Sequence, residues 1–203
     1  MRIATWNVNS LKARLEKVLW WLERAAPDDQ PLREPRMVSA IAGGQIRVVS
    51  LYAPNGRTVD SIYYQAKLAW YGRLGRWLDE TRRPDEPLVL GGDFNVAPTD
   101  ADVWDPAAFE GATHVSAPER AALAELERWG LVDVFRTLQS EPGLFSWWDY
   151  RAGNFHKRQG MRIDLVMVSA ALAERATYAV IDRNARKGQA PSDHAPVIID
   201  FAD

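Results

Sequence analysis

A short apolar run near the middle of the chain, ending in a glycine pair and two polar residues, constrains the fold more than any other stretch. Residues 88–90 are Leu-Val-Leu, and Gly91-Gly92 follows them, which is typical of a buried central strand whose backbone then turns or packs closely. Asp93 and Asn95 come next, and in extended backbone their side chains would share one face. Carboxylate and amide oxygens at a sheet edge can hold a hard cation together with its substrate. A simple polar turn fits this stretch equally well, because Gly, Asp and Asn are all common in turns.

The composition is that of a globular protein without disulfides. Of the 203 residues, 47% are hydrophobic, 26% are charged and none is cysteine, and no apolar run is long enough to span a bilayer. These features exclude thiolate metal sites and predict a soluble, cytoplasmic protein with no membrane partner. The formal net charge is −2. Any affinity for nucleic-acid phosphates must therefore come from a local patch or from a metal.

Helical and extended patterns alternate along the chain without an internal repeat or linker. The alternation predicts an α/β or α+β class with layered sheets. Gly43-Gly44 marks the turn of a hairpin, Ser116 is a candidate helix cap, and Gly130 a helix end. We expect strands over 2–6, 37–42, 45–52, 88–90, 131–135, 162–169 and 196–201, and helices over 11–25, 61–81 and 118–129.

Polar residues adjoin several of the predicted strands. Asn7 follows the first strand, Asp164 lies within another, and Asp193-His194 precedes the last. Sheet proteins commonly build active sites at such positions. Asn7 alone is better interpreted as a loop residue, and a lone histidine is more often structural than catalytic. An Asp-His pair on the loop that enters a strand is a stronger sign of function.

Six segments, in chain order, resemble the exonuclease III family of DNA repair nucleases, within the wider endonuclease/exonuclease/phosphatase fold. The segment at 145–151 separates this branch from the phosphoinositide and sphingomyelin phosphodiesterases of the same fold. The six segments are 3–9 (IATWNVN), 51–56 (LYAPNG), 92–100 (GDFNVAPTD), 145–151 (FSWWDYR), 160–164 (GMRID) and 191–196 (PSDHAP).

The resemblance implies one domain over residues 1–203 with a deoxyribonuclease-I-like fold. That fold is a four-layered sandwich of two packed β-sheets flanked by helices. The resemblance also implies a Mg²⁺- or Mn²⁺-dependent phosphodiesterase that acts on double-stranded DNA, cutting 5′ to abasic sites and trimming 3′ ends. No obligate protein partner is implied, and we expect a monomer.

The resemblance assigns roles to the polar residues. Asn7 and Asp193 fall at metal-binding positions, and Asp93 and Asn95 lie in the same metal corner. Asp93 would orient or deprotonate the attacking water, which is work for a carboxylate. Asn95 would steady the phosphoryl oxygens.

Four more residues complete the implied site. His194 would contact the scissile phosphate, oriented by Asp164, since a fixed donor or cation there stabilises the developing charge. Tyr52 would lie near the phosphate, and its role as a nucleophile stays open. Trp147 would wall the pocket for the extruded abasic sugar.

A basic and aromatic segment from 147 to 162 fits a DNA-facing loop, since cations hold phosphates and aromatic rings stack on bases or sugars. A solvated loop is the alternative, and we expect Trp148 to belong to the core. The candidate DNA contacts are Trp147, Arg151, Lys157, Arg158 and Arg162.

One family feature has no counterpart in the sequence. The family's second strand carries a glutamate that is its main metal carboxylate, and here several strands of chain are missing near 29–36, which shortens one sheet. Glu34 is the one nearby glutamate, but Pro35 and the lost register disfavour it as the replacement. Fewer carboxylates weaken a hard-cation site.

Three hypotheses follow. The first is an active Mg²⁺-dependent repair nuclease. The second is a shortened, weak or inactive relative that binds DNA. The third is a small-molecule phosphodiesterase or phosphatase of the same fold, which segment 147–151 disfavours.

Overall fold

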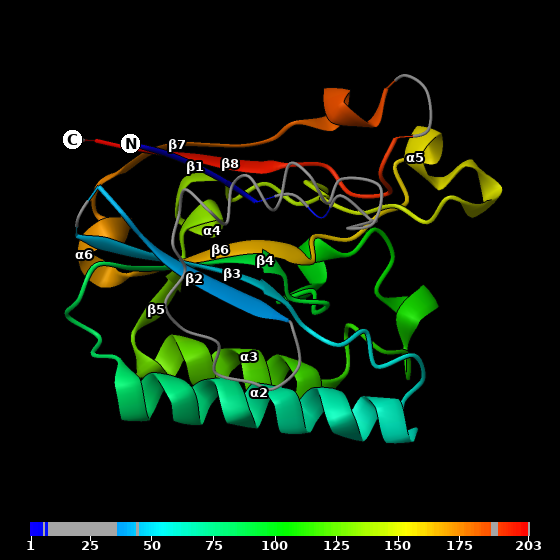
Figure 1. The fold of residues 1–203 in the computed structure, drawn as a ribbon. Coiled ribbons are helices and arrows are strands. Elements are labelled where there is room, and N and C mark those ends of the chain that lie inside the picture. Colours follow the sequence, from blue (N-terminus) through cyan, green and yellow to red (C-terminus); the bar gives the residue numbers. More distant parts are fainter. Residues whose placement is uncertain (6, 8–35, 44, 188–190, 203) are drawn as a thin grey trace.

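Two β-sheets stack with a pair of long helices on the outer face of the larger sheet (Figure 1). The computed structural model describes residues 1–5, 7, 36–43, 45–187 and 191–202. The helix predicted over 11–25 and Glu34 lie outside these residues, as does most of the region near 29–36. Among the described residues, no helix is both long enough and apolar enough to cross a membrane.

Among the described residues, the larger sheet has five strands in the order β2-β3-β4-β6-β5. β3 and β4 are parallel, and the other pairs are antiparallel. β4 lies at the centre and each of its residues is buried, as its apolar run predicts. The strands are β2 (Met37–Ala42), β3 (Ile46–Tyr52), β4 (Leu88–Asp93), β5 (Leu131–Asp133) and β6 (Asp164–Ser169).

The smaller sheet is antiparallel, with the order β1-β8-β7. Its strands are β1 (Arg2–Thr5), β7 (Ala176–Ile181) and β8 (Val197–Phe201). The sequence pattern did not reveal β7. This strand lies at the sheet edge and alternates only weakly between buried and exposed positions, so it has little of the period-two signal that marks a strand.

Two long helices, α2 (Ile62–Thr81) and α3 (Ala117–Trp129), cover the outer face of the larger sheet. Ser61 caps α2 by accepting the Tyr64 N–H. Ser116 caps α3 as predicted, and the structure adds a capping box with Glu119. The side chains of Trp70, Leu74 and Leu78 join the strands in one apolar cluster. The two helices therefore fix the outer face of the sheet whose strand ends carry the candidate site.

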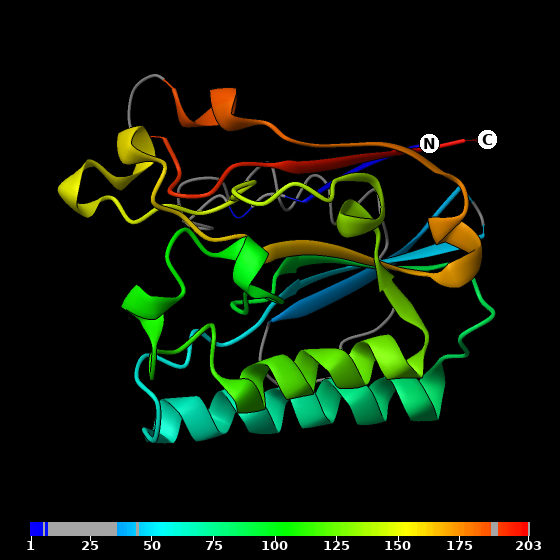
Figure 2. The same ribbon diagram turned by 180° about the vertical axis from the view of Figure 1, so that it is seen from behind.

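Short helices connect the sheets. The expected extended piece over 131–135 was partly wrong, because β5 ends at Asp133 and Val134 begins a helix that contacts both β6 and β7 (Figure 2). The short elements are α4 (Val134–Leu138), α5 (Asn154–Lys157), α6 (Ala170–Ala173), η1 (Asp100–Asp102), η2 (Ala107–Phe109), η3 (Arg151–Gly153) and η4 (Arg183–Arg186).

The inner faces of the sheets meet in a second apolar cluster. Val89 and Val166 of the larger sheet belong to it together with Val197 and Ile199 of the smaller sheet. The two termini lie side by side at one end of the molecule, and strand-connecting loops gather at the opposite end (Figure 1). The predicted α/β class with two sheets flanked by helices is confirmed.

Of the two glycines after Leu90, Gly92 lies where only glycine fits, whereas Gly91 does not. A Cβ on Gly92 would lie 1.9 Å from the Leu51 carbonyl oxygen of the neighbouring strand, and its φ of +158° also disfavours a side chain. A Cβ on Gly91 would have Thr5 Cβ as its nearest neighbour, at 3.5 Å. Gly92 therefore permits the close approach of β3 that places Tyr52 beside Asp93.

We predict that Gly92→Ala lowers the free energy of unfolding by about 3 kcal/mol or more, because backbone atoms must move to relieve the overlap. Gly91→Ala should change it by less than about 1 kcal/mol, since ordinary van der Waals contact accommodates a methyl group there. Urea unfolding of both variants measures the difference. Equal effects would contradict the close approach at Gly92.

Candidate active site

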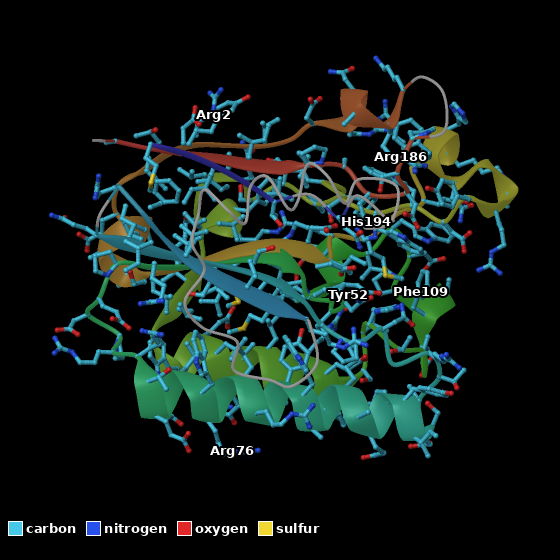
Figure 3. All side chains as sticks on the ribbon, in the orientation of Figure 1. Arg2, Tyr52, Arg76, Phe109, Arg186 and His194 are labelled. Atoms are coloured by element: carbon cyan, nitrogen blue, oxygen red, sulfur yellow. The ribbon has the colours of Figure 1, made fainter. Side chains whose placement is uncertain are left out.

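Strand pairing brings the separated polar residues to one end of the sandwich. Asp93 at the end of β4 pairs in register with Asp164 at the start of antiparallel β6 and with Tyr52 at the end of parallel β3. In the smaller sheet, Thr5 pairs with Val197, and Asn7 meets the segment that precedes β8 through a hydrogen bond from Ser192. Tyr52 and His194 lie at this end, far from Arg2 near the termini (Figure 3).

A chain of polar contacts joins the two sheets. Nδ1 of His194 lies 2.7 Å from Asp164 Oδ2, and its Nε2 lies 3.8 Å from Asp93 Oδ2. The side-chain amide of Asn7 donates to Asp93 Oδ2 at 3.1 Å and lies 3.4 Å from His194 Nε2. The predicted grouping of these four residues is thus present. Asp93, Asp164 and His194 are each 5% exposed or less.

Asn95 fixes the orientation of Asp93. Its backbone N–H donates to Asp93 Oδ1 at 2.9 Å, and its side-chain amide donates to the Ala53 carbonyl at 2.9 Å. Its side-chain oxygen accepts from Asn55 at 3.2 Å. Asn95 has a φ of +53°, a left-handed conformation that asparagine adopts more readily than most residues. Its polar groups are engaged with protein, which favours a supporting role over that of a metal ligand.

Asp193 lies at the rim of this cluster beside Trp147. The indole Nε1–H of Trp147 donates to Asp193 Oδ2 at 3.0 Å, and Trp147 also bridges the backbones of Met161 and His194. Trp147 is partly exposed, as the wall of a pocket would be. Trp148 is only 1% exposed and belongs to the core, as predicted.

Two buried serines hold the loops in place, and the sequence patterns did not single them out. Ser146 Oγ accepts the backbone N–H groups of Ile163 and Asp164, and so fixes the start of β6. Ser192 Oγ donates to the Asn7 carbonyl and accepts the His194 N–H. Both serines lie inside the family-like segments, but nothing in those patterns distinguishes a buried hydroxyl from a surface one.

The buried charges raise two pKa values in the cluster. Burial and the neighbouring charge of Asp164 raise the pKa of Asp93 to about 7. Burial alone would lower the pKa of His194, but the charge and hydrogen bond of Asp164, together with Asp93 and Asp193, raise it to about 9. At neutral pH the imidazole is therefore a cation fixed against Asp164, suited to an anionic substrate.

Tyr52 is poorly suited to act as a nucleophile. Burial and the charge of Asp93 raise the pKa of its hydroxyl, so the phenol keeps its proton at neutral pH. Tyr52 is 45% exposed, and the guanidinium of Arg36 lies 5.4 Å from the ring centroid. It can donate a hydrogen bond at the rim of the site.

The sequence profile of the Endonuclease/Exonuclease/phosphatase family matches residues 20–194. The chain belongs to this family. It is 31% identical over 194 residues to an exodeoxyribonuclease III of Haemophilus influenzae, across 89% of this chain and 72% of the relative. It is 34% identical to an exodeoxyribonuclease of Bacillus subtilis, across 74% of this chain and 58% of that protein. The predicted exonuclease III family and nuclease class are therefore confirmed.

Solved structures of relatives share the fold over nearly the whole chain. An AP endonuclease from Archaeoglobus fulgidus superposes with a TM-score of 0.87 and 28% identity, covering 99% of both chains. A 3′ phosphatase from Neisseria, bound to a product DNA hairpin, superposes with a TM-score of 0.86 and 30% identity, covering 100% of this chain and 99% of the other. These two family members carry different names on closely similar folds.

The donor chemistry of the site fits a hard divalent cation. Asn7, Asp93 and Asp193 supply amide and carboxylate oxygens, and the buried Asp164 Oδ1 has no hydrogen-bond partner among the described residues. Across the described part of the chain, no three acidic, histidine or cysteine side chains are arranged to hold a metal ion. The set suits Mg²⁺, which keeps several waters and takes only one or two carboxylates. Glu34, the remaining predicted ligand, lies outside the described residues.

Three of the predicted DNA contacts are on the surface, and one prediction is wrong. Arg151 on η3, Lys157 on α5 and Arg158 directly after α5 are exposed. Arg151 also pairs with Asp149. Arg162 is fully buried, 2.7 Å from Asp102 and 2.6 Å from Asp133. It cannot contact DNA, and it ties the loops before β6 to β5. Sequence alone did not show that two distant aspartates enclose this cation.

A second buried arginine holds the basic loop in shape. Arg186 is 8% exposed, donates to the Ser192 carbonyl, and lies 5.3 Å from the Tyr150 ring and 4.9 Å from the Phe155 ring. The Tyr150 hydroxyl donates to the Pro191 carbonyl. These contacts fasten the loop that carries Arg151 to the loop that carries Asp193.

We predict that Asp93→Asn stabilises the protein in EDTA at pH 8. The folded-state pKa of about 7 exceeds the ordinary aspartate pKa of 3.8, so ionisation of Asp93 favours unfolding increasingly as pH rises from 3.8 through 7. The free energy of unfolding should rise by about 1 kcal/mol or more at pH 8, and the gain should shrink towards pH 4. Chemical denaturation at both pH values measures it, with the exposed Asp79→Asn as control. A loss of stability at pH 8 would contradict the buried charge.

Proposed function

We propose that this chain is a divalent-metal-dependent DNA phosphodiesterase of the exonuclease III type. It would act as a single-domain monomer in the cytoplasm, on double-stranded DNA with abasic sites or 3′ ends. The observation that carries the proposal is the hydrogen-bonded arrangement in which Asn7 and Asn95 hold Asp93 while Asp164 holds His194.

The residues divide the work of phosphodiester hydrolysis. Asp93 is oriented by two donors and has a pKa near neutrality, so it can align a water molecule and accept its proton. His194 presents an imidazolium to a phosphate oxygen, and Asp164 keeps its ring in place. Mg²⁺ or Mn²⁺, held by oxygens of Asn7 and Asp193 with Asp93, would neutralise charge on the phosphate.

The surface beside the site suits a DNA backbone. Exposed Arg151, Lys157 and Arg158 supply cations for phosphates, and Trp147 supplies an aromatic wall next to Asp193. The names of the relatives, an AP endonuclease and a 3′ phosphatase bound to a DNA product, support incision at abasic sites and trimming of 3′ ends as the activities to examine.

A second candidate is a DNA-binding protein with weak or no catalysis. The observation that favours it is that the described residues contain no three acidic or histidine side chains arranged around a metal position. Both candidates predict DNA binding, and they differ in the chemical step.

An incision assay separates these candidates. The wild-type protein and Asp93→Ala are incubated with a duplex containing one abasic analogue, with Mg²⁺ or with EDTA. We expect metal-dependent incision that falls by about 100-fold or more in Asp93→Ala, because the group that orients and deprotonates water is lost. Asp79→Ala, on the exposed face of α2, should cut like the wild type.

Gel shifts and duplexes with a recessed 3′ hydroxyl or a 3′ phosphate complete the test. Equal DNA binding by both proteins, with none of the three substrates processed in Mg²⁺ or Mn²⁺, would favour the non-catalytic candidate. Processing that persists in EDTA would contradict the metal requirement.

A further inference from the structure

A buried lysine on α2 reaches the back of the candidate active site. Lys67 is 0% exposed, and its ammonium donates to the Asn95 carbonyl at 2.6 Å, the Asn55 carbonyl at 3.2 Å and Glu119 Oε1 at 2.5 Å. These contacts use all three hydrogens of the ammonium group. Lys67 therefore joins the loop after β3 to the loop after β4.

The contacts of Asn95 explain why this link matters. Asn95 holds Asp93 through its backbone N–H, and it does so in a left-handed conformation with a φ of +53°. Its carbonyl oxygen receives Lys67 on one side and the imidazole Nδ1 of His114 at 2.6 Å on the other. Both lone pairs of this carbonyl are thereby engaged, which fixes the peptide unit between Asn95 and Val96, next to the N–H group that holds Asp93.

Glu119 holds the lysine in place. Its Oε1 accepts from Lys67 and from Thr113, and its Oε2 accepts from Ser116 at the start of α3. Glu119 is fully buried, so the pair is removed from water. Buried ion pairs often add little net stability over apolar residues of similar size, so stability alone is a weak reason for a charge at this position.

We propose that Lys67, held by Glu119, is a positioning residue for catalysis that sets the geometry of Asp93 through the Asn95 carbonyl. The proposal rests on the proposed function, because it assigns Lys67 a part in that reaction. Lys67 itself touches neither substrate nor metal. Removing it should leave DNA binding largely intact, because the candidate DNA-contacting cations lie on η3 and at α5, and α5 lies across the molecule from α2 (Figure 1). It should lower the rate of the chemical step.

The experiment compares Lys67→Met, Lys67→Met/Glu119→Gln and Leu78→Ala. The double variant avoids leaving a carboxylate unpaired in the interior, so it keeps the test valid if the single variant folds poorly. Leu78 is a buried residue eleven positions further along the same helix, and its truncation controls for general destabilisation. Thermal denaturation verifies that each variant is folded, and all assays are run below its transition temperature.

Two readouts are measured. Hydrogen exchange by NMR at the Asn95 amide reports directly on the bond to Asp93 and needs no substrate. Steady-state cleavage of the abasic duplex separates kcat from KM. We expect faster Asn95 exchange in both Lys67 variants and a fall in kcat of about 10- to 100-fold with KM little changed. Leu78→Ala should reproduce neither effect.

The outcomes distinguish this inference from the proposed function. If the wild-type protein cuts no DNA, the proposed function fails, and faster Asn95 exchange would still support positioning by Lys67. Unchanged Asn95 exchange in the Lys67 variants would overturn the inference. So would an unchanged kcat, or equal losses in Leu78→Ala.

Discussion

Two carboxylates buried side by side, Asp93 and Asp164, impose the constraint on which the rest of the site depends. Strand register places them opposite each other at the ends of β4 and β6. Burial of like charges is unfavourable unless a cation and hydrogen-bond donors oppose it. His194 supplies the cation, and Asn7 and Asn95 supply donors to Asp93. Loops from both sheets must therefore meet at this end for the acids to be held there.

The sequence predicted the features that follow from local pattern. The apolar run of β4, the Ser116 helix cap and the Gly130 helix end all appear where expected, because each depends on neighbouring residues alone. The grouping of Asn7, Asp93, Asp164 and His194 could be predicted because each adjoins a strand or the loop entering one. The edge strand β7 could not, since an exposed edge places weak demands on hydrophobic alternation.

Long-range polar contacts could not be predicted from the sequence. Arg162 was predicted to face DNA because it adjoins a basic loop, yet Asp102 and Asp133 enclose it in the interior. Lys67 was overlooked because a lysine on a helix is usually solvated, and only the packing of α2 against α3 brings Glu119 to it. A buried cation depends on partners far away in the chain, so the burial of these two residues follows from tertiary structure.

We propose that the chain keeps a functional metal corner at Asn7, Asp93 and Asp193. The direct measurement is a crystal structure with Mn²⁺, using anomalous scattering to locate the ion. We expect a peak within coordination distance of the side-chain oxygens of Asn7 and Asp193, close to Asp93. The proposed metal corner would be contradicted if the protein cleaves DNA and is saturated with Mn²⁺ but shows no anomalous peak at these oxygens.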